Sequence, residues 1–296
     1  MSLGLGWLRW FAVASTFAAV FGDPGVAPAV GRDASPCNGL PALCDRPYDE
    51  VAFATTHNAM SNADDGWIGP NQQHGLTRQL QDGIRALMLD VHSYAGRTYL
   101  CHGYCWLGKK LLADGLGEIR AFLDANPQEV VTIIFESYVS AAEVEAAFAE
   151  SELLRYAHEQ DVGDPWPALG EMIADGHRLV VFTDKEGGVY PWYHDVWQYA
   201  WETDYANKAP SDFSCDVNRG STASALFILN HFLTNPIALP SLAEKVNHNP
   251  FFLDRAQLCK DAAQQQPNFV TVDFYSIGDV LDVVLHLNAT ATVAAS

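Results

Sequence analysis

The sequence predicts an α/β protein built as a single, irregular (β/α)8 TIM barrel. Eight strand-like segments with nearly continuous apolar residues alternate with helical patterns over about 250 residues, as in parallel sheets that are covered on both faces. The chain has 296 residues, 49% of them hydrophobic and 18% charged, which is typical of a globular protein with a large core. An open doubly wound sheet is the alternative, but it needs a glycine-rich turn after a strand, and we find none in the sequence.

The predicted strands extend from residue 51 to residue 275. They are 51–55, 84–91, 98–102, 130–137, 178–184, 196–203, 226–232 and 269–275. Between them, LGEIRAFLDANP (116–127) has apolar residues at helical spacing and stops at a proline. A second helix, predicted over 140–157, opens with Ser140 and has Glu143 three residues later, the pattern of a capping box. The connection HSYAGR (92–97) is too short for a helix, so the predicted barrel is irregular.

The first residues predict export. One basic residue, Arg9, precedes a run of about a dozen apolar residues followed by small ones, which is typical of a secretory signal peptide. We place this peptide at 1–22, with a cleavage point anywhere up to about residue 35. An uncleaved N-terminal anchor is the alternative, although the apolar run is short for a membrane span. The globular domain is placed at 37–285 and a C-terminal tail at 286–296.

The six cysteines all follow the predicted leader. An even number of cysteines in an exported chain indicates disulfide bonds, and their spacing suggests Cys37–Cys44, Cys101–Cys105 and Cys215–Cys259, although other pairings remain open. A zinc site is the competing interpretation. It is weaker, because the sequence contains no CxxC pair and no HExxH motif.

Acidic residues greatly outnumber basic ones. The chain has 36 Asp and Glu against 17 Lys and Arg, for a net charge of −19, and the predicted leader contains only one of the basic residues. This balance disfavours nucleic acid as a partner and disfavours adhesion to anionic membranes through a basic patch. No obligate protein partner is evident in the sequence. A protein of this charge that acts on a phosphate compound needs a local cation.

Polar or ionisable residues follow seven of the eight predicted strands, where a (β/α)8 barrel places its active site. They are His57 with Asn58, Asp90 with His92, His102, Glu136, Lys185, Asn230 with His231, and Asp273. His57 and His102 form the natural acid/base pair, because imidazole titrates near neutral pH. Asn58, Asp90 and Glu136 supply the hard oxygen ligands that suit calcium, or magnesium as the alternative ion.

Three motifs resemble the X region of phosphatidylinositol-specific phospholipase C, in particular its secreted members that consist of this domain alone. They are THNAMS (56–61), GIRALMLDVHSYAGRTYLCHG (83–103) and NPQEVVTIIFES (126–137), and the similarity extends over roughly residues 37 to 280. The resemblance implies that His57 is the general base on the inositol 2-hydroxyl. It implies that His102 is the general acid for the leaving diacylglycerol oxygen, and that a cyclic inositol phosphate results.

The same resemblance implies a calcium site made by Asn58, Asp90 and Glu136. Metal-independent bacterial members have arginine and lysine at the positions of Asp90 and Glu136, so the two carboxylates indicate the calcium-using type. Met88 departs from that type, which has a glutamate two residues before Asp90. The implied site therefore has fewer protein ligands and more water, and binds calcium more weakly.

Further residues are assigned supporting roles. Asp273 is expected to hold His57 in its productive tautomer. Lys185 is expected to contact phosphate and Tyr205 to stack on the inositol ring, and Arg85 and Asn230 are also candidates for substrate contacts. The expected partner is a phospholipid substrate at a membrane surface, bound transiently.

Two other functions remain open on the same barrel. One is a glycerophosphodiesterase-like or sphingomyelinase D-like enzyme, which usually has a denser cluster of carboxylates. The other is a secreted binding protein that has lost catalysis, which Met88 favours and the intact histidine pair opposes. Trp192 and Trp197 are more consistent with core packing than with a membrane contact, and the NAT sequence at Asn288 matches a glycosylation signal.

Overall fold

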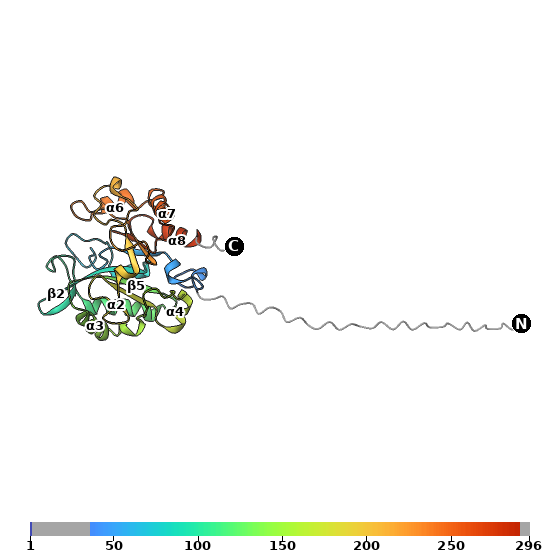
Figure 1. Cartoon of the computed structure of the whole chain (residues 1–296), viewed down its shortest axis with the longest axis horizontal. Helices are drawn as coiled ribbons and strands as arrows, with labels where there is room; N and C mark the ends of the chain where they lie inside the picture. Colours follow the sequence, from blue (N-terminus) through green and yellow to red (C-terminus); the bar gives the residue numbers. More distant parts are fainter. Residues whose placement is uncertain (2–35, 291–296) are drawn as a thin grey trace. The chain divides into compact units, whose positions relative to one another are not determined.

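The computed structural model describes Met1 and residues 36–290 (Figure 1). The predicted leader beyond Met1 and the last six residues of the predicted tail lie outside the described residues. The strands are β1 (Phe53–Thr56), β2 (Ala86–Tyr94), β3 (Arg97–Leu100), β4 (Lys110–Leu111), β5 (Val131–Ser137), β6 (Leu179–Thr183), β7 (Tyr193–Asp195), β8 (Ala200–Glu202), β9 (Leu226–Asn230) and β10 (Phe269–Val272). The α-helices are α1 (Leu76–Gln81), α2 (Leu112–Ala125), α3 (Ala141–Glu150), α4 (Leu169–Asp175), α5 (Val196–Tyr199), α6 (Pro240–Val246), α7 (Phe251–Ala263) and α8 (Val280–Thr290). Short 3-10 helices are η1 (Pro41–Leu43), η2 (Tyr48–Glu50), η3 (Leu153–Tyr156) and η4 (Pro210–Asp212).

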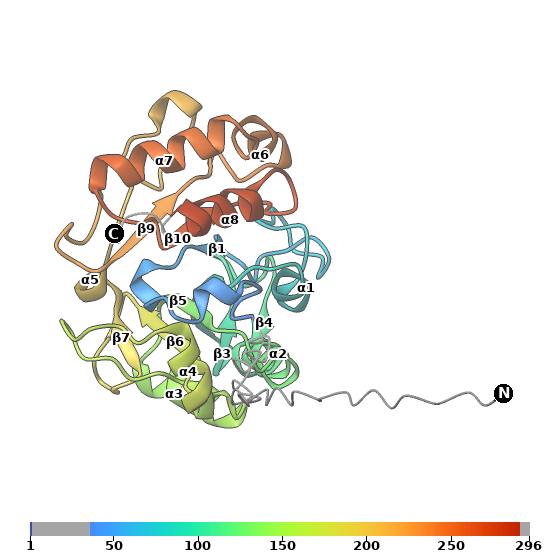
Figure 2. The ribbon, with the colours of Figure 1, turned by 90° about the vertical axis from the view of Figure 1, so that its right-hand side faces the viewer.

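Eight parallel strands form a curled sheet in the order β7-β6-β5-β2-β1-β10-β9-β8. This is the strand order of a (β/α)8 barrel, because the last strand, β10, pairs with the first, β1. Within the described part of the chain, β7 and β8 do not pair, so the barrel is open between them. Helices surround the strands (Figure 2). The predicted fold, an irregular α/β barrel, is confirmed.

The two faces of each strand belong to two different hydrophobic clusters. Phe53, Ile134 and Phe182 belong to the cluster inside the barrel, whereas their neighbours Ala54 and Phe135 belong to the cluster that packs against the surrounding helices. This alternation follows from the two-residue period of a strand. Both faces are apolar, which explains why the strands are nearly continuous apolar runs.

The inner cluster also closes the amino-terminal end of the barrel. Tyr48 is fully buried there, stacks on Trp166 at a ring-centroid distance of 4.6 Å, and its hydroxyl lies 2.6 Å from the hydroxyl of Thr132. Burial of a large apolar side chain contributes about 1.5–3 kcal/mol, so this plug is a substantial part of the core. A ligand therefore reaches the interior from the carboxyl ends of the strands.

Two predicted strands differ from the structure. The segment predicted at 98–102 is β3, which pairs antiparallel with β2 and is not one of the eight barrel strands. The segment predicted at 196–203 is one helical turn, α5, followed by β8, because the side chain of Asp195 accepts a hydrogen bond from the Trp197 N–H at 3.0 Å and begins the turn. The eighth barrel strand, β7, has only three residues and was not predicted.

Several smaller expectations can be compared with the structure. The disulfides Cys37–Cys44, Cys101–Cys105 and Cys215–Cys259 are all present, and Ser140 and Glu143 form a capping box at the start of α3. Trp192 is buried in the core. The glycosylation match was wrong: Asn288 is buried in α8, where its side chain exchanges two hydrogen bonds of 2.9 Å with the backbone of Ala52. Across the described residues, no helix is both long and apolar enough to span a bilayer.

The free edge of β8 is covered by the loop at 203–225. The Glu202 N–H donates to the Arg219 carbonyl at 3.0 Å and the Asn218 N–H donates to the Glu202 carbonyl at 2.8 Å, an antiparallel bridge beside β8. Gly220 follows with φ +82°, and a Cβ added there would lie 2.3 Å from the carbonyl oxygen of Ala200. Only glycine fits this close approach, so the bridge depends on Gly220.

We predict that Gly220→Ala destabilises the protein more than Gly176→Ala does. Gly176 ends α4 with φ +80° and has open space around its Cβ position, so its substitution costs only the backbone strain, about 1–2 kcal/mol. Gly220→Ala adds a backbone clash, and overpacking typically costs a further ~1–3 kcal/mol. Denaturant unfolding of both variants measures the difference. Equal losses of unfolding free energy would show that the bridge tolerates a side chain.

Candidate active site

The pairing of β1 with β10 brings His57 to Asp273. Thr56 is the register partner of Val272, so the residues that follow the two strands, His57 and Asp273, are neighbours. The imidazole Nδ1 lies 3.0 Å from Asp273 Oδ1, and Nε2 lies 3.2 Å from the side-chain nitrogen of Asn58. The carboxylate can only accept and the amide nitrogen can only donate, so Nδ1 carries the proton and Nε2 carries the lone pair.

Residues from two further loops contact the His57–Asp273 pair. The side chain of Asn71, on the loop after β1, donates to Asp273 Oδ1 at 3.1 Å. The ring of Phe232, which follows β9, stacks on the His57 imidazole at 4.0 Å. The orientation and tautomer of His57 are therefore set by contacts from loops that follow three different strands.

A second histidine–carboxylate pair forms at β2 and β3. Val91 is the register partner of Leu100, so Asp90 lies beside the loop that begins at Cys101, and the Cys101 N–H donates to the Asp90 carbonyl at 3.2 Å. His102 Nδ1 lies 2.9 Å from Asp90 Oδ2. This hydrogen bond with the Asp90 carboxylate raises the pKa of His102 above its ordinary value. His102 therefore keeps its proton at higher pH than a free imidazole does.

The two histidines differ in exposure. The side chain of His57 is 25% exposed and that of His102 is 49% exposed. Both carboxylate partners, Asp273 and Asp90, are buried. One imidazole thus lies within the barrel mouth and the other lies at its rim.

A cavity of about 260 Å³ opens at the carboxyl ends of the strands. Its polar lining is formed by His57, Asn58, Asp90, Glu136, Asp184, Glu202, Tyr205, Arg219 and Asn230, together with apolar residues that include Met88 and Phe232. Four of these side chains are carboxylates, and Arg219 is the one Lys or Arg among the lining residues that the structure describes. Such a lining suits a ligand with several hydroxyl groups, because carboxylates accept hydrogen bonds from hydroxyls.

The three predicted metal ligands all line this cavity. Asp90 and Glu136 are register partners on β2 and β5, and Asn58 follows β1 with a φ of +46°. One oxygen of Asp90 is bonded to His102 and one oxygen of Glu136 accepts from the Tyr138 hydroxyl, which raises the pKa of Tyr138. No hydrogen bond from a described residue engages Asp90 Oδ1, Glu136 Oε2 or Asn58 Oδ1.

These three oxygens are hard donors, the ligand type that calcium prefers. No group of three His, Cys, Asp or Glu side chains that could hold a metal is found within residues 36–290. The candidate set reaches three donors only because it includes the amide of Asn58. Met88 lines the cavity at the position where the metal-dependent pattern has a further glutamate.

Glu202 organises the opposite side of the cavity. Its carboxylate is buried and accepts three hydrogen bonds: from the Asn230 side chain at 3.0 Å, from the Asn218 side chain at 3.2 Å and from Arg219 Nε at 2.5 Å. Asn230 donates a second bond, to the Thr203 carbonyl at 2.8 Å. Asn230 was predicted to contact substrate, and in the structure its amide nitrogen is committed to holding Glu202 and Thr203.

Arg219 was missed by the sequence reasoning. Its guanidinium carbon lies 4.4 Å from the ring centre of Trp197 and 4.7 Å from that of Tyr205, and its Nε is bonded to Glu202. Within the described residues no hydrogen bond engages its two terminal nitrogens. The only sequence signal was a lone arginine in the polar stretch after β8.

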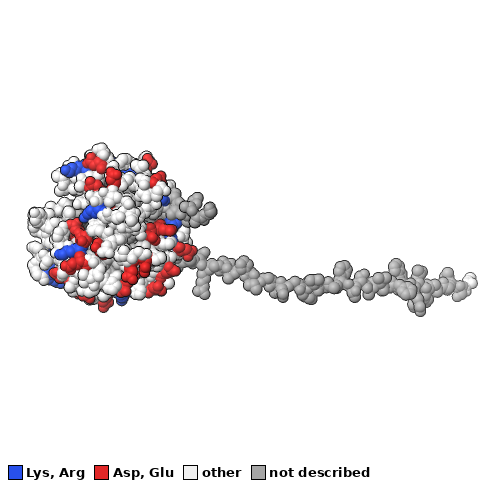
Figure 3. Space-filling model, viewed as in Figure 1, with Lys and Arg blue, Asp and Glu red and all other residues white. Residues whose placement is uncertain are grey.

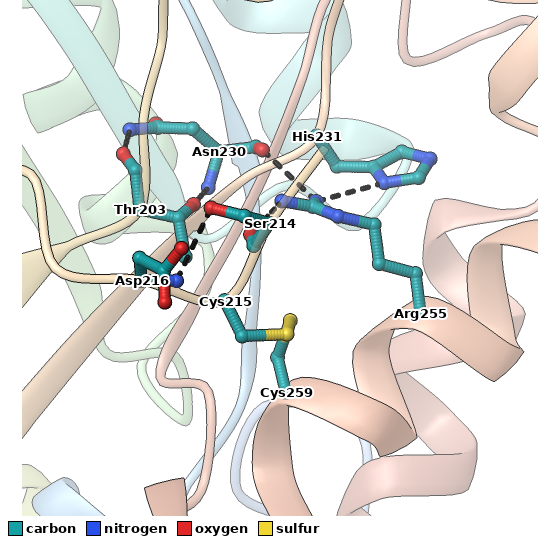
Figure 4. The surroundings of a disulfide bond; sticks show 8 residues. All are labelled: Thr203, Ser214, Cys215, Asp216, Asn230, His231, Arg255 and Cys259. Atoms are coloured by element: carbon teal, nitrogen blue, oxygen red, sulfur yellow. Dashed lines mark hydrogen bonds between the residues drawn. A yellow bond between two sulfur atoms is a disulfide. The ribbon is translucent and has the colours of Figure 1, made fainter. Parts of the chain in front are cut away.

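The loop that brings Arg219 and Tyr205 to the cavity is clamped onto α7 (Figure 4). Cys259 bonds to Cys215, and one turn earlier Arg255 donates to the Ser214 carbonyl at 3.1 Å. Arg255 also donates to the Asn230 carbonyl at 3.0 Å and lies 3.1 Å from His231 Nδ1.

Burial keeps His231 neutral, so that it can accept this bond from Arg255. Desolvation lowers the pKa of His231 to about 3 and that of Arg255 to about 9. The ring of His231 donates its other N–H to the Val246 carbonyl at 2.8 Å. His231 is therefore part of the clamp and does not line the cavity.

Two predicted substrate contacts are not brought to the cavity. Arg85 lies at the amino-terminal end of β2, opposite to the cavity, where it pairs with Glu129 at 2.6 Å and donates to the carbonyls of Leu80 and Ile84. Lys185 lies in a turn after β6, where its backbone bonds with Thr183, and its side chain is exposed. Asp184, one residue earlier, lines the cavity instead.

Comparisons with known proteins agree on one family. The model of the PI-PLC X domain family matches residues 43–288. A PI-PLC X domain-containing protein of Arabidopsis thaliana is 31% identical over 86% of this chain and 66% of its own length. An uncharacterized secreted protein of Arthroderma benhamiae is 29% identical over 86% of this chain and 63% of its own length. The chain thus spans just under two thirds of these two relatives.

Solved structures show the same fold. A mutant of phosphatidylinositol-specific phospholipase C from Staphylococcus aureus superposes with a TM-score of 0.56 at 13% identity, covering 83% of this chain and 95% of that one. A second structure of the enzyme from that organism, from work on its membrane binding, gives a TM-score of 0.55 at 15% identity, over 83% and 94% of the two chains. At these identities the likeness shows the fold alone.

We predict that the double variant Cys215→Ser/Cys259→Ser loosens the loop at 203–225. Without the covalent link, one main-chain bond from Arg255 remains to hold Ser214 on α7. Amide hydrogen exchange in the loop should accelerate by about tenfold or more, while that of the barrel strands stays slow. Cys37→Ser/Cys44→Ser is the matched control, with faster exchange near residues 37–51 only. Unchanged exchange at 203–225 in the first variant would mean that the disulfide does not hold the loop.

Proposed function

The chain belongs to the PI-PLC X domain family, and from this premise we propose that it is an exported phosphodiesterase. The proposed reaction cleaves the phosphodiester of an inositol phospholipid, or of a glycosylated relative, by intramolecular attack of a headgroup hydroxyl. The observation that carries the proposal is that one cavity at the carboxyl ends of the barrel strands is lined by one member of each of two histidine–carboxylate pairs, His57 from the pair with Asp273 and Asp90 from the pair with His102. Three disulfides and a relative named as secreted support export.

His57 has the geometry of a general base. Its Nδ1–H is held by Asp273, and the lone pair of Nε2 accepts a hydrogen bond from the Asn58 amide, which an incoming substrate hydroxyl would replace. Nε2 takes the proton of the attacking hydroxyl as that oxygen bonds to phosphorus. Buried Asp273 then faces an imidazolium, whose charge it stabilises.

His102 has the properties of the general acid. Asp90 accepts the Nδ1–H bond and raises the pKa of the ring above its ordinary value, which favours the protonated ring whose Nε2–H can be given to the departing oxygen. Hydrolysis of a cyclic product would reverse the two roles. In that step His102 takes a proton from water and His57 returns one to the ring oxygen.

Calcium is the proposed cofactor. Asn58, Asp90 and Glu136 would hold it, and when bound it would offset the charge on the phosphate oxygens. Asp90 would then serve both the ion and His102. On the other side of the cavity, Tyr205 and Arg219 lie against each other where the headgroup ring would be placed.

A binding protein without catalysis is the second candidate. The observation that favours it is Met88, an apolar side chain on the cavity wall beside the proposed ion site. A glycerophosphodiesterase-like activity shares the barrel and remains an alternative substrate choice. Parallel assays of inositol, glycerol and choline phospholipids distinguish the substrates, and binding of inositol phosphate without turnover would favour the second candidate.

We predict that His57→Ala and His102→Ala each lower turnover of phosphatidylinositol by about 100- to 10,000-fold, the usual contribution of general acid/base catalysis. Phosphorus NMR of the products measures the rate and shows whether a cyclic phosphate forms. His177→Ala is the matched control, because this exposed histidine precedes β6 at the opposite end of the barrel. Wild-type turnover in either single variant of the pair would refute its assigned role.

We predict that chelation of calcium abolishes turnover and that Glu136→Gln raises the calcium concentration needed for half-maximal rate, because one charged ligand is lost. The control is Glu171→Gln, an exposed glutamate in the first turn of α4. Calcium titrations of the rate provide the measurement. Full activity of the wild type in chelator would exclude the proposed cofactor while leaving the histidine pair untouched.

A further inference from the structure

The proposed general acid is held by fewer side-chain contacts than the proposed base. The ring of His57 is hydrogen-bonded at both nitrogens and stacked on a phenyl ring. The ring of His102 has one hydrogen bond with another described residue, to Asp90, and its side chain is 49% exposed. The position of the acid therefore depends on the backbone of the loop that carries it.

A disulfide closes this loop around His102. Cys101 follows β3 and immediately precedes His102, and it is bonded to Cys105 in a ring of five residues. Both cysteines are buried, and the Cys101 N–H donates to the Asp90 carbonyl at 3.2 Å. Gly103, directly after His102, has a φ of +64°, which lets the chain turn back toward Cys105. The backbone on both sides of the acid is thus constrained.

The small size of this ring indicates a local role. The sequence separation of its two cysteines is 4, against 7 and 44 for the other two disulfides. A disulfide stabilises a fold mainly by restricting the unfolded chain, and this effect decreases as the closed loop becomes shorter. Among the three disulfides, Cys101–Cys105 therefore contributes least to global stability. Its main effect falls on the five residues that it encloses, and the general acid is one of them.

The loop after β1 holds the far end of the acid's loop. The Ile68 N–H donates to the Leu107 carbonyl at 2.8 Å. Gly108 lies so close to buried Trp67 that an added Cβ would be 2.3 Å from the indole ring. His102 lies between this fixed end and the end of β3, and the disulfide is the covalent link that spans it.

A largely buried lysine strengthens the same attachment. Lys110, the first residue of β4, is 19% exposed, and its Nζ lies 3.0 Å from Asp65 Oδ2 and 2.5 Å from Glu118 Oε1. Acidic side chains are spread over the face shown in Figure 3, and the chain has 17 Lys and Arg for 36 Asp and Glu. In a chain with few basic residues, Lys110 is committed to joining β4 to the loop after β1. The acid's loop therefore begins and ends at fixed points.

We propose that the Cys101–Cys105 disulfide is a positioning element for the general acid, which keeps the Nε2–H of His102 directed at the departing oxygen of the phosphodiester. The inference rests on the proposed function, because that reaction needs an acid. In the step concerned, the phosphorus–oxygen bond to the leaving group breaks, its electron pair stays on the oxygen, and the proton of Nε2 passes to that oxygen. A cross-linked ring has fewer conformations than an open loop, so the acid stays near its productive position.

The test compares two soluble phosphodiesters of inositol that differ only in the leaving group, a simple alkyl alcohol or 4-nitrophenol. An alkoxide needs a proton to depart, whereas nitrophenolate is a stable anion and needs none. For the alkyl ester, Cys101→Ala/Cys105→Ala should lower kcat by about 10- to 100-fold with KM unchanged. For the nitrophenyl ester it should keep the wild-type rate. The matched control is Cys37→Ala/Cys44→Ala, a disulfide outside the cavity lining, which should keep both rates.

A double-mutant cycle shows whether the disulfide acts through His102. His102→Ala removes the acid, so adding the two cysteine substitutions to it should slow turnover of the alkyl ester no further. Losses that multiply would mean that the disulfide acts on another part of the site.

A second variant disturbs the ring without removing the disulfide. Gly103→Ala places a side chain at a positive φ with no atom within 4 Å of the added Cβ, so it strains the backbone beside His102 without a clash. It should show the same selective loss on the alkyl ester. If the cysteine variant does not fold, this variant decides the question, and wild-type turnover of the alkyl ester would then contradict the proposal.

Two results with the folded cysteine variant would overturn the inference alone. They are an equal loss on both esters, which indicates a general structural role, and an unchanged rate on the alkyl ester. Absence of turnover of both esters by the wild type would instead refute the proposed function, and the inference with it.

Discussion

One buried carboxylate, that of Glu202, holds the loop that covers the free edge of β8 at the opening of the barrel. A carboxylate inside a protein is strongly destabilising unless hydrogen bonds replace its hydration. Glu202 receives three, from Asn230 on β9 and from Asn218 and Arg219 on the covering loop. The same contacts that satisfy the charge fasten the loop along the free edge of β8. The free edge of β8 is thus covered by main-chain and side-chain bonds with the loop, and Arg219 is placed in the cavity as a consequence.

The other half of the cavity depends on strand register instead. His57 and Asp273 meet because β1 and β10 pair in parallel and end at the same level, whereas Asp90 and His102 meet because β2 and β3 pair antiparallel. A shift of one residue in either register would turn these side chains to the other face of the sheet. The apolar faces of the strands prevent such a shift, so the core determines the geometry of the polar site.

Contacts set by local pattern and parallel pairing could be predicted from the sequence, whereas contacts set by long loops could not. The apolar runs predicted seven of the eight barrel strands, and the polar residues at their ends include His57, Asp90 and Glu136. Strand β7 was missed because three residues carry too little periodicity. Arg219 was missed because its position depends on Gly220 and on Glu202, neither of which forms a sequence motif with it. Arg85 was misplaced because its charge was considered without its position at the amino-terminal end of β2.

The difference in exposure between the two histidines is explained if the substrate lies across the cavity in one direction. The amino-terminal end of the barrel is closed by Tyr48 and Trp166, so under the proposed function a polar headgroup would enter from the carboxyl ends of the strands and lie among Glu202, Arg219 and Tyr205. Under the proposed function, the attacking hydroxyl belongs to the headgroup and the leaving oxygen to the lipid. The base must then lie inside the mouth and the acid must lie toward the membrane. His57 and His102 have this arrangement, and the Cys101–Cys105 disulfide closes the short loop that carries the acid.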